Sequence, residues 1–412
     1  MSLRAVHTAD WHFSAQRNRI DADTGLNSRL IDFYRCARFT IEDGLSRGAQ
    51  LVLHAGDAFH GCRPTPSEVR LLREALRPAL EAGVPVVLLL GNHDAPRSPA
   101  EKHALDLVRE TPGLLVIDRS MLLNVWQGDG RVMVEPTNVA TPDGRDLALQ
   151  LACLPWPNKQ LLLADEEYRR LDPGQLNEVV RQKMMDCLQG LVADCIPGIT
   201  AILLAHLSVD LAQAGGQNRL MALGGEWTLN VHDVAGLGFD AVCLGHIHRA
   251  QVLCDAPWIG YCGSPEAVTF GEETEGKSYC LLDVHDDCSV AVEQIPTPHR
   301  RFLTIDLSNG HALPTPDELA GAIVRVRVPQ ASDVDFAALR RDLEAAGVHE
   351  YQVETQRAET VRRRAVAVSS EMALEEAIKA YLEQRPELQP LADALLAEAR
   401  VVEQTVVAGG AA

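Results

Sequence analysis

The feature that most constrains this fold is an alternation, early in the chain, of short apolar runs with longer stretches of helical periodicity. The apolar runs have the length of strands, and apolar side chains recur every three or four residues in the stretches between them. We therefore expect strands at Leu3 to Val6, Leu51 to Leu53 and Val84 to Leu90, and helices at about Asn27 to Arg47 and Ser67 to Glu81. Such a β-α-β-α-β series builds a sheet covered by helices.

Similar patterns predict a second group of strands and a helical insertion between about Gln160 and Val192. These strands are expected at Leu147 to Cys153, Ala201 to Ala205, Ala241 to Leu244, Trp258 to Tyr261 and Tyr279 to Val284. A smaller α/β unit should follow, with strands at Phe302 to Leu307, Ile323 to Val328 and Tyr351 to Glu354 and a helix from Phe336 to Ala345. We expect three parts: a principal domain of residues 1–295, a small α/β domain of residues 296–364, and a helical tail of residues 365–412.

Composition indicates an ordinary folded protein, because 46% of the 412 residues are hydrophobic and 23% are charged. No apolar run is long enough to span a membrane and the first residues lack the layout of a signal peptide, so we expect a cytoplasmic protein. The ten cysteines form no C-x-x-C pair and are expected to be reduced. The net charge of −19 argues against a broad basic surface that coats nucleic acid, although it leaves room for a metal site.

Potential metal ligands are concentrated in five short segments, each of which follows an apolar run. The segments are Asp10-Trp11-His12, Gly56-Asp57, Gly91-Asn92-His93-Asp94, Ala205-His206 and Gly245-His246-Ile247-His248. In an α/β sheet, ligands bind beyond the carboxyl ends of the strands, so the five segments should converge in space. By contrast, His7 and His54 lie inside apolar runs, and we expect them to be core residues.

The chemistry of these side chains indicates a site for two divalent ions. Carboxylate, imidazole and amide donors without thiolate suit ions such as manganese better than structural zinc. A carboxylate such as Asp57 could bridge two ions, which would clamp a phosphodiester and activate a water molecule. The sequence therefore predicts phosphoester hydrolysis.

These motifs resemble the signature of the calcineurin-like metallophosphoesterases. Within that superfamily, longer segments resemble the SbcD-type nuclease subunits of the DNA double-strand-break repair complex; they are HTADWH, HAGDAFHGCRPTPSEV, GNHDAPRS, GHIHRAQ and GSPEAVTFGEE. The resemblance implies an α/β protein whose metallophosphoesterase β-sandwich is flanked by helices, with a small α/β cap that orients DNA and a helical tail that binds the partner ATPase.

The resemblance also implies roles for individual residues. One ion would be held by Asp10, His12, Asp57 and His248, and a second ion by Asp57, Asn92, His206 and His246, with Mn²⁺ as the expected metal. His93 would lie beside the metals as a general acid, Asp94 could hold its ring in place, and His60 would match an auxiliary histidine.

The activity implied is cleavage of DNA, exonucleolytic on duplex ends and endonucleolytic on single strands. The implied partners are DNA, an SbcC-type coiled-coil ATPase that docks on the tail from Glu371 to Glu403, and a second copy of the chain. Two alternatives are a phosphatase or cyclic-nucleotide phosphodiesterase on the same metal site, and a non-catalytic protein that tethers DNA ends.

One further motif is expected to carry no chemistry of its own. The stretch from Gly271 to Ser278 satisfies the phosphate-binding pattern G-x-x-x-x-G-K-[ST], but the segment from Tyr279 to Val284 continues as a strand. A phosphate-binding loop has to open a helix, and three glutamates would repel a triphosphate. We interpret the stretch as a hairpin turn and expect Lys277 to have no part in ATP binding or in activity.

Overall fold

The computed structural model describes residues 2–96, 102–137, 144–157, 168–213, 227–307, 313–329 and 334–356, together with Lys379 and residues 395–397. Within those ranges we find no helix with the length and apolar character needed to span a lipid bilayer. The chain divides into two compact units: residues 1–305, 312–326 and 336–352 form the larger, and residues 306–311, 327–335 and 353–412 the smaller. Nearly all of the expected tail, residues 365–412, lies outside the described residues.

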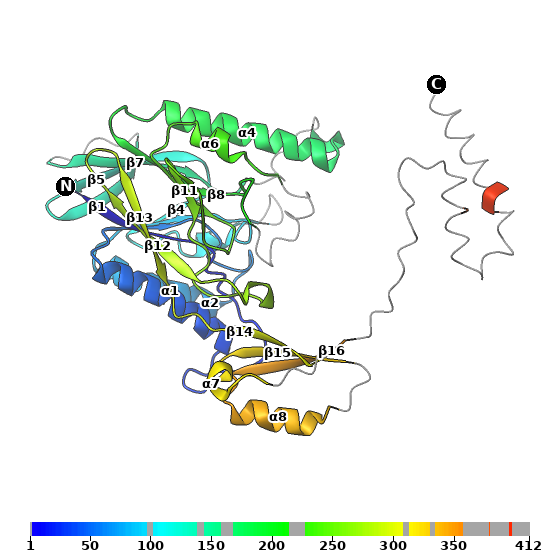
Figure 1. Ribbon diagram of the computed structural model, residues 1–412. Coiled ribbons are helices and arrows are strands. Elements are labelled where there is room, and N and C mark those ends of the chain that lie inside the picture. The colour runs from blue at the N-terminus through cyan, green and yellow to red at the C-terminus, as the bar shows by residue number, and fades with distance from the viewer. Residues whose placement is uncertain are drawn as a thin grey trace. The chain divides into compact units, whose positions relative to one another are not determined.

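Two sheets packed face to face form the centre of the larger unit (Figure 1). The six-stranded sheet has the order β13-β12-β1-β2-β3-β4 and the seven-stranded sheet the order β10-β11-β9-β8-β7-β5-β6. Strands of the first sheet are β1 (Leu3–Thr8), β2 (Leu51–His54), β3 (Val86–Leu89), β4 (Leu114–Ile117), β12 (Ser278–Val284) and β13 (Val290–Pro296). Strands of the second are β5 (Met121–Gly128), β6 (Arg131–Pro136), β7 (Asp146–Leu154), β8 (Thr200–His206), β9 (Ala241–Gly245), β10 (Gln251–Asp255) and β11 (Trp258–Tyr261).

Helices cover the outer face of each sheet, which makes a four-layer sandwich (Figure 1). The helices α1 (Ser28–Ser46) and α2 (Pro66–Glu81) pack on the six-stranded sheet, and α4 (Pro173–Ala193) and α6 (Val231–Ala235) pack on the other. Strands buried on both faces explain the continuous apolar runs of the sequence. Along β2, for example, Leu51 and Leu53 face the second sheet while Val52 faces the helices.

Capping residues set the starts of the two helices that cover the first sheet. The side chain of Asn27 accepts the backbone N–H groups of Arg29 and Leu30 at the start of α1, which confirms its expected role as an N-cap. Thr65 and Glu68 form a capping box at the start of α2. The "RPTPS" stretch, residues 63–67, therefore begins a helix, which is a structural reason for its composition.

The predicted fold class is confirmed, including the β-α-β-α-β series. Five strands were missed: β4, β5, β6, β10 and β13. The helical insertion is present as α4, and residues 160–167 of the expected range lie outside the described residues. One interpretation was wrong, because the stretch from Gly271 to Ser278 is not a hairpin turn: β11 and β12, the strands on either side of it, belong to different sheets.

The expected small α/β unit follows these sheets in the chain. Its three strands have the order β14-β15-β16, and its elements are β14 (Phe302–Asp306), α7 (Pro316–Leu319), β15 (Ile323–Pro329), α8 (Phe336–Ala345) and β16 (Glu350–Gln356). Valines and an isoleucine alternate with arginines along β15, the pattern of a strand with one buried face. Its role as a separate DNA-capping domain stays a prediction.

Candidate metal centre

The five predicted segments meet at the carboxyl ends of central strands from both sheets. Asp10 and His12 follow β1, Asp57 follows β2, and Asn92, His93 and Asp94 follow β3, all in the six-stranded sheet. From the seven-stranded sheet, His206 ends β8, while His246 and His248 follow β9. Each sheet thus contributes a separate set of donors to one place, as expected for the end of an α/β sheet at which ligands bind.

The backbone at this place adopts an unusual conformation. Asp10, His12, Asp57 and His246 have positive φ angles of 55°, 47°, 58° and 102°. Such angles are unfavourable for residues with a Cβ and persist only where the surroundings enforce them, at a cost of about 1–3 kcal/mol each. Strain of this kind clusters at functional sites, and here it occurs at four of the predicted ligand residues, just beyond the ends of their strands.

Two glycines of the motifs are explained by close approach of neighbouring atoms. A Cβ on Gly91 would lie 2.1 Å from Oδ1 of Asp57, and a Cβ on Gly245 would lie 2.1 Å from the carbonyl oxygen of Ala55. Both distances are far below van der Waals contact. Any larger residue at Gly91 would therefore displace the Asp57 side chain.

One group of donor atoms comes from residues that follow β1 and β9. Nε2 of His12 is 2.9 Å from Nε2 of His248, and Oδ2 of Asp57 is 3.8 Å from the same His12 nitrogen. Potential ligand atoms of Asp10, His12 and His248 all lie within 4.8 Å of one another, and all three residues are buried. Burial, together with the neighbouring His248, holds the pKa of His12 well below its usual range. The ring is therefore neutral and can offer a lone pair to a cation.

A second group of donor atoms surrounds the amide of Asn92. Its Oδ1 lies 2.9 Å from Nε2 of His206 and 2.9 Å from Nδ1 of His246. Oδ2 of Asp57 is 3.5 Å from the His206 nitrogen. Asp57 thus contacts histidines of both groups, and the donors match the carboxylate, imidazole and amide ligands that divalent ions accept.

Further hydrogen bonds fix which ring nitrogen faces the centre. Nδ1 of His206 donates to the carbonyl oxygen of Ala55 at 2.6 Å, and Nδ1 of His248 lies 3.2 Å from Oε1 of Glu272. In each ring this leaves Nε2 toward the other donors, which is the usual role of the outer partners of metal-binding histidines. Sequence reasoning missed Glu272, because its contact with His248 depends on the tertiary fold.

Charges at the centre shift the pKa values of its acidic and basic groups. Burial alone would raise the pKa of Asp57, but the charge of His206 and the hydrogen bond to it hold that pKa well below its usual range. Burial would lower the pKa of His206, whereas the charge of Asp57 raises it to about 9. The centre therefore holds an ionised carboxylate between histidines.

The three predicted auxiliary residues also lie beside this cluster. His60 and His93 are half-buried and stack with ring centroids 5.0 Å apart, and Nδ1 of His60 is 3.3 Å from Nδ1 of His12. The expected contact between Asp94 and the His93 ring was wrong. Nδ1 of His93 instead donates to the carbonyl oxygen of His60 at 3.0 Å.

Asp94 serves the backbone of the centre. Its carboxylate accepts the N–H groups of Ala58, Phe59 and Gly91 at 3.1, 2.9 and 3.2 Å. It thereby ties the turn after β2 to the turn after β3. Burial and the charge of Asp57 raise the pKa of Asp94 to about 7.

Trp156 is a second residue that sequence reasoning missed. Its ring stacks on His246 with centroids 5.0 Å apart and meets the edge of His206 at 6.0 Å. Its backbone N–H donates to the carbonyl oxygen of Leu90, at the end of β3. The "LPWP" segment after β7 thus packs against two of the predicted ligands.

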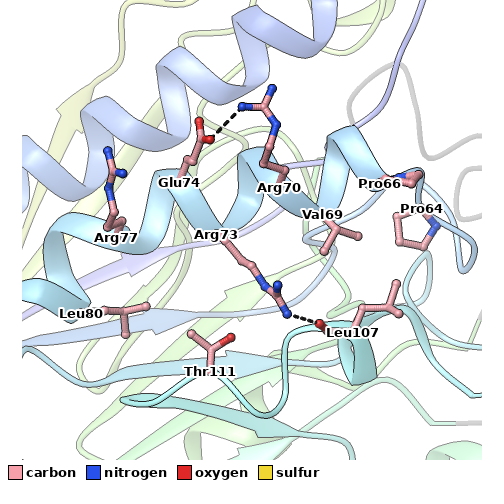
Figure 2. Close-up of a pocket in the computed structure, with 10 residues that line it drawn as sticks. All are labelled: Pro64, Pro66, Val69, Arg70, Arg73, Glu74, Arg77, Leu80, Leu107 and Thr111. Carbon is pink, nitrogen blue, oxygen red and sulfur yellow. Dashed lines mark hydrogen bonds and ion pairs between the residues drawn. The ribbon is translucent and has the colours of Figure 1, made fainter.

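A groove of about 750 Å³ lies elsewhere, on the outer side of α2 (Figure 2). Arg73 reaches across it to the carbonyl oxygen of Leu107, and Arg70 pairs with Glu74. The groove shares no residue with the histidine and aspartate cluster. Its lining consists of Pro64, Pro66, Val69, Arg70, Arg73, Glu74, Arg77, Leu80, Leu107 and Thr111.

Comparison with known proteins connects this cluster to a family. The model of the calcineurin-like phosphoesterases matches residues 3–250. The SbcD component of the nuclease SbcCD from Rhodobacter capsulatus is 28% identical over 360 residues, which cover 82% of this chain and 81% of that protein. The corresponding SbcD component from Bacillus subtilis is 25% identical over 291 residues, which cover 68% and 66%.

A third relative carries a name from DNA repair. The DNA double-strand break repair protein Mre11 of Methanocaldococcus jannaschii is 22% identical over 311 residues, which cover 74% of this chain and 69% of that protein. The resemblance to SbcD-type nucleases is confirmed by these relatives. Since the family model spans more than half of the chain and the side chains at the strand ends are donors that divalent ions take, the chain belongs to the calcineurin-like phosphoesterase family and is a metal-dependent hydrolase of that family.

Proposed function

We propose that this chain is a metal-dependent DNA nuclease, exonucleolytic on duplex ends and endonucleolytic on single strands, that acts with an SbcC-type ATPase in the repair of DNA breaks. The observation that carries the proposal is the position of Asp57, whose Oδ2 lies 3.5 Å from His206 and 3.8 Å from His12. A carboxylate shared by two groups of donors suits a two-metal phosphodiesterase. The substrate class comes from the names of the relatives.

The ligands follow from the two groups of donors. Asp10, His12, Asp57 and His248 would hold one ion, and Asp57, Asn92, His206 and His246 would hold the other. Oxygen and imidazole donors of this kind support Mn²⁺ as the physiological metal. Bound ions would stabilise charge on the attacking and leaving oxygens of a phosphodiester and make water a better nucleophile at neutral pH.

His93 is the candidate general acid. A carbonyl oxygen can only accept, so Nδ1 carries the hydrogen bonded to His60, and Nε2 remains to exchange a proton. The ring packs edge-on against His12, with centroids 4.8 Å apart, which places it next to a predicted ligand. We propose that Nε2 of His93 protonates the departing 3′ oxygen, with His60 and Asp94 as supporting residues.

The partners follow from the charge of the chain. With a net charge of −19, a broad cationic surface for DNA has to come from elsewhere. We propose that the ATPase partner and a second copy of the chain supply much of it. Because the proposed substrate is DNA, the proposal includes the cytoplasmic location expected from the sequence.

The activity is tested by presenting two substrates to the purified full-length chain in MnCl₂. We expect degradation of linear duplex DNA that stops on addition of a chelator, with slower turnover of bis(p-nitrophenyl) phosphate. Efficient turnover of the small ester without any DNA cleavage would support a phosphatase or cyclic-nucleotide phosphodiesterase instead. DNA retention without cleavage in MnCl₂ would support a tethering role.

The partner is tested separately, by shortening the chain. A chain that ends at Arg364 should still bind metal and no longer co-purify with its coiled-coil ATPase, because the tail is the proposed docking element. If the shortened chain assembles with the ATPase as tightly as the full chain does, docking occurs elsewhere.

A further inference from the structure

A buried lysine lies directly behind the metal centre. Lys277 is only 1% exposed, and its Nζ forms an ion pair with Glu272. The same nitrogen lies 3.2 Å from Glu275, 3.1 Å from Oγ of Ser264 and 3.3 Å from the carbonyl oxygen of His248. This is the lysine of the G-x-x-x-x-G-K-[ST] pattern between Gly271 and Ser278, and it faces the protein interior.

Glu272 connects that lysine to a predicted ligand. While Oε2 pairs with Lys277, Oε1 lies 3.2 Å from Nδ1 of His248. The backbone N–H groups of Val268 and Thr269 also donate to Oε1, each at 3.3 Å. Glu272 is 1% exposed, and these contacts leave its carboxylate a single orientation.

We infer that Lys277 and Glu272 are positioning residues that fix the ring of His248 for metal binding. Lys277 holds His248 at two points, directly at its carbonyl oxygen and through Glu272 at its ring nitrogen. The result is that Nε2 of His248 faces Nε2 of His12, 2.9 Å away. The inference rests on the proposed function, in which His248 is a ligand.

Stability alone does not explain this arrangement. A buried ion pair contributes little net stability compared with apolar side chains of similar volume, because both charges lose their hydration. A partner is needed, however, if the Glu272 carboxylate is needed, since a buried carboxylate without a counter-charge is costly and does not keep its position. Lys277 therefore holds the Glu272 carboxylate in place. Contacts of this type typically change metal affinity by about 10–100-fold.

The test is the binding of Mn²⁺ to the full-length chain, measured by calorimetry for Lys277→Met, Glu272→Gln and the double variant. We expect each single variant to lower the affinity for one of the two ions about tenfold or more and to leave the affinity for the other ion unchanged. Because the two residues act as one unit, the double variant should lose no more affinity than the single variants lose. Glu272→Gln keeps the shape of the side chain, so it remains informative if Lys277→Met does not fold.

Glu275→Gln is the matched control. It removes a carboxylate that also pairs with Lys277 but has no contact with the His248 ring among those the structure describes, and its Mn²⁺ affinity should stay within twofold of wild type. The inference is overturned if Lys277→Met and Glu272→Gln bind Mn²⁺ as this control does, or if their effects add in the double variant. If His248→Ala binds both ions with wild-type affinity, the ligand assignment fails and the inference fails with it.

Discussion

Two buried clusters of charge in the larger unit differ in how their groups are paired. Near the start of α1, Arg29 lies 2.8 Å from Asp32 and 3.1 Å from Glu266, and Arg300 contacts Asp32 through two nitrogens, each at 2.6 Å. Each of these cations faces a carboxylate. In the metal centre, by contrast, imidazole nitrogen faces imidazole nitrogen at 2.9 Å.

The difference separates a structural network from a binding site. Buried charges have to be paired, and the network near α1 pairs each of its two cations with carboxylates of the chain itself. In the centre, Nε2 of His12 and Nε2 of His248 face each other, so that a cation between them is the natural partner. Burial alone does not distinguish the two clusters, but the close approach of two imidazole nitrogens in the centre does.

The largest effect is expected from the residue shared by both groups of donors. Asp57→Ala should abolish cleavage and remove both ions while leaving the fold nearly intact, because the other ligands then lack their bridge. Metal analysis and circular dichroism would measure this, with the surface variant Asp118→Ala as a control that keeps both ions. Two ions per chain in Asp57→Ala would contradict the bridge.

A smaller effect is expected from a group beside the donors. His93→Ala should retain both ions and DNA affinity and lower kcat by about 10²–10⁴-fold, the usual loss when a general acid is removed. Metal analysis beside steady-state kinetics would show it, and His103→Ala, a histidine in a surface ion-pair cluster, should have wild-type kcat. Loss of one ion from His93→Ala would instead make His93 a ligand.

The network near α1 should respond in the opposite way. Arg29→Met leaves Asp32 and Glu266 with one cation fewer and should reduce the free energy of unfolding by about 3–5 kcal/mol without changing Mn²⁺ affinity. Chemical denaturation of the metal-free chain measures the first quantity. Arg70→Met, which breaks an exposed pair on α2, should cost less than about 1 kcal/mol. A matching fall in Mn²⁺ affinity for Arg29→Met would erase the distinction between the two clusters.

The smallest effect concerns His7, a buried residue that belongs to neither cluster. Burial lowers its pKa to about 3, against 6.5 when it is exposed. Between these values the unfolded chain binds the additional proton, so stability falls as the pH falls from about 6.5 toward 3. We expect the free energy of unfolding, measured with urea on the metal-free chain, to fall between pH 7 and pH 5.5. In His7→Phe this fall should be about 1 kcal/mol smaller than in wild type. Equal losses would show that His7 is hydrated or paired.

The parts of the fold that could be predicted are those with a strong local signal. Asn27 marks the start of α1, and the range expected for α8, Phe336 to Ala345, is the observed one. The missed strand β13 lies at the edge of its sheet and buries only Ile295, while Val290 and Val292 are half-buried and its other residues are exposed. An edge strand that buries so few of its side chains has a weak apolar pattern.

The donors of the centre could be predicted for a different reason. Asp10, Asp57 and His206 stand at strand ends, and strand ends converge whatever the details of packing. Contacts between side chains have no such rule. Glu272, Trp156 and the carbonyl oxygen of His60 reach the centre through loops whose paths depend on the whole fold, and nothing in the local sequence indicates them.

The apolar layer between the sheets has a consequence for the tuning of this enzyme. Donors after β1, β2 and β3 are attached to one wall of that layer, and donors at the ends of β8 and β9 to the other. The distance between the two sets of donors is therefore set by the size of interior side chains such as Leu53 and Leu204, which contact neither an ion nor a substrate. Protein interiors are close-packed. Adding or removing one methylene group in this layer therefore shifts one sheet relative to the other rather than filling a void. Turnover could thus be adjusted from inside the protein, by changes of volume at positions that a survey of the active surface would overlook.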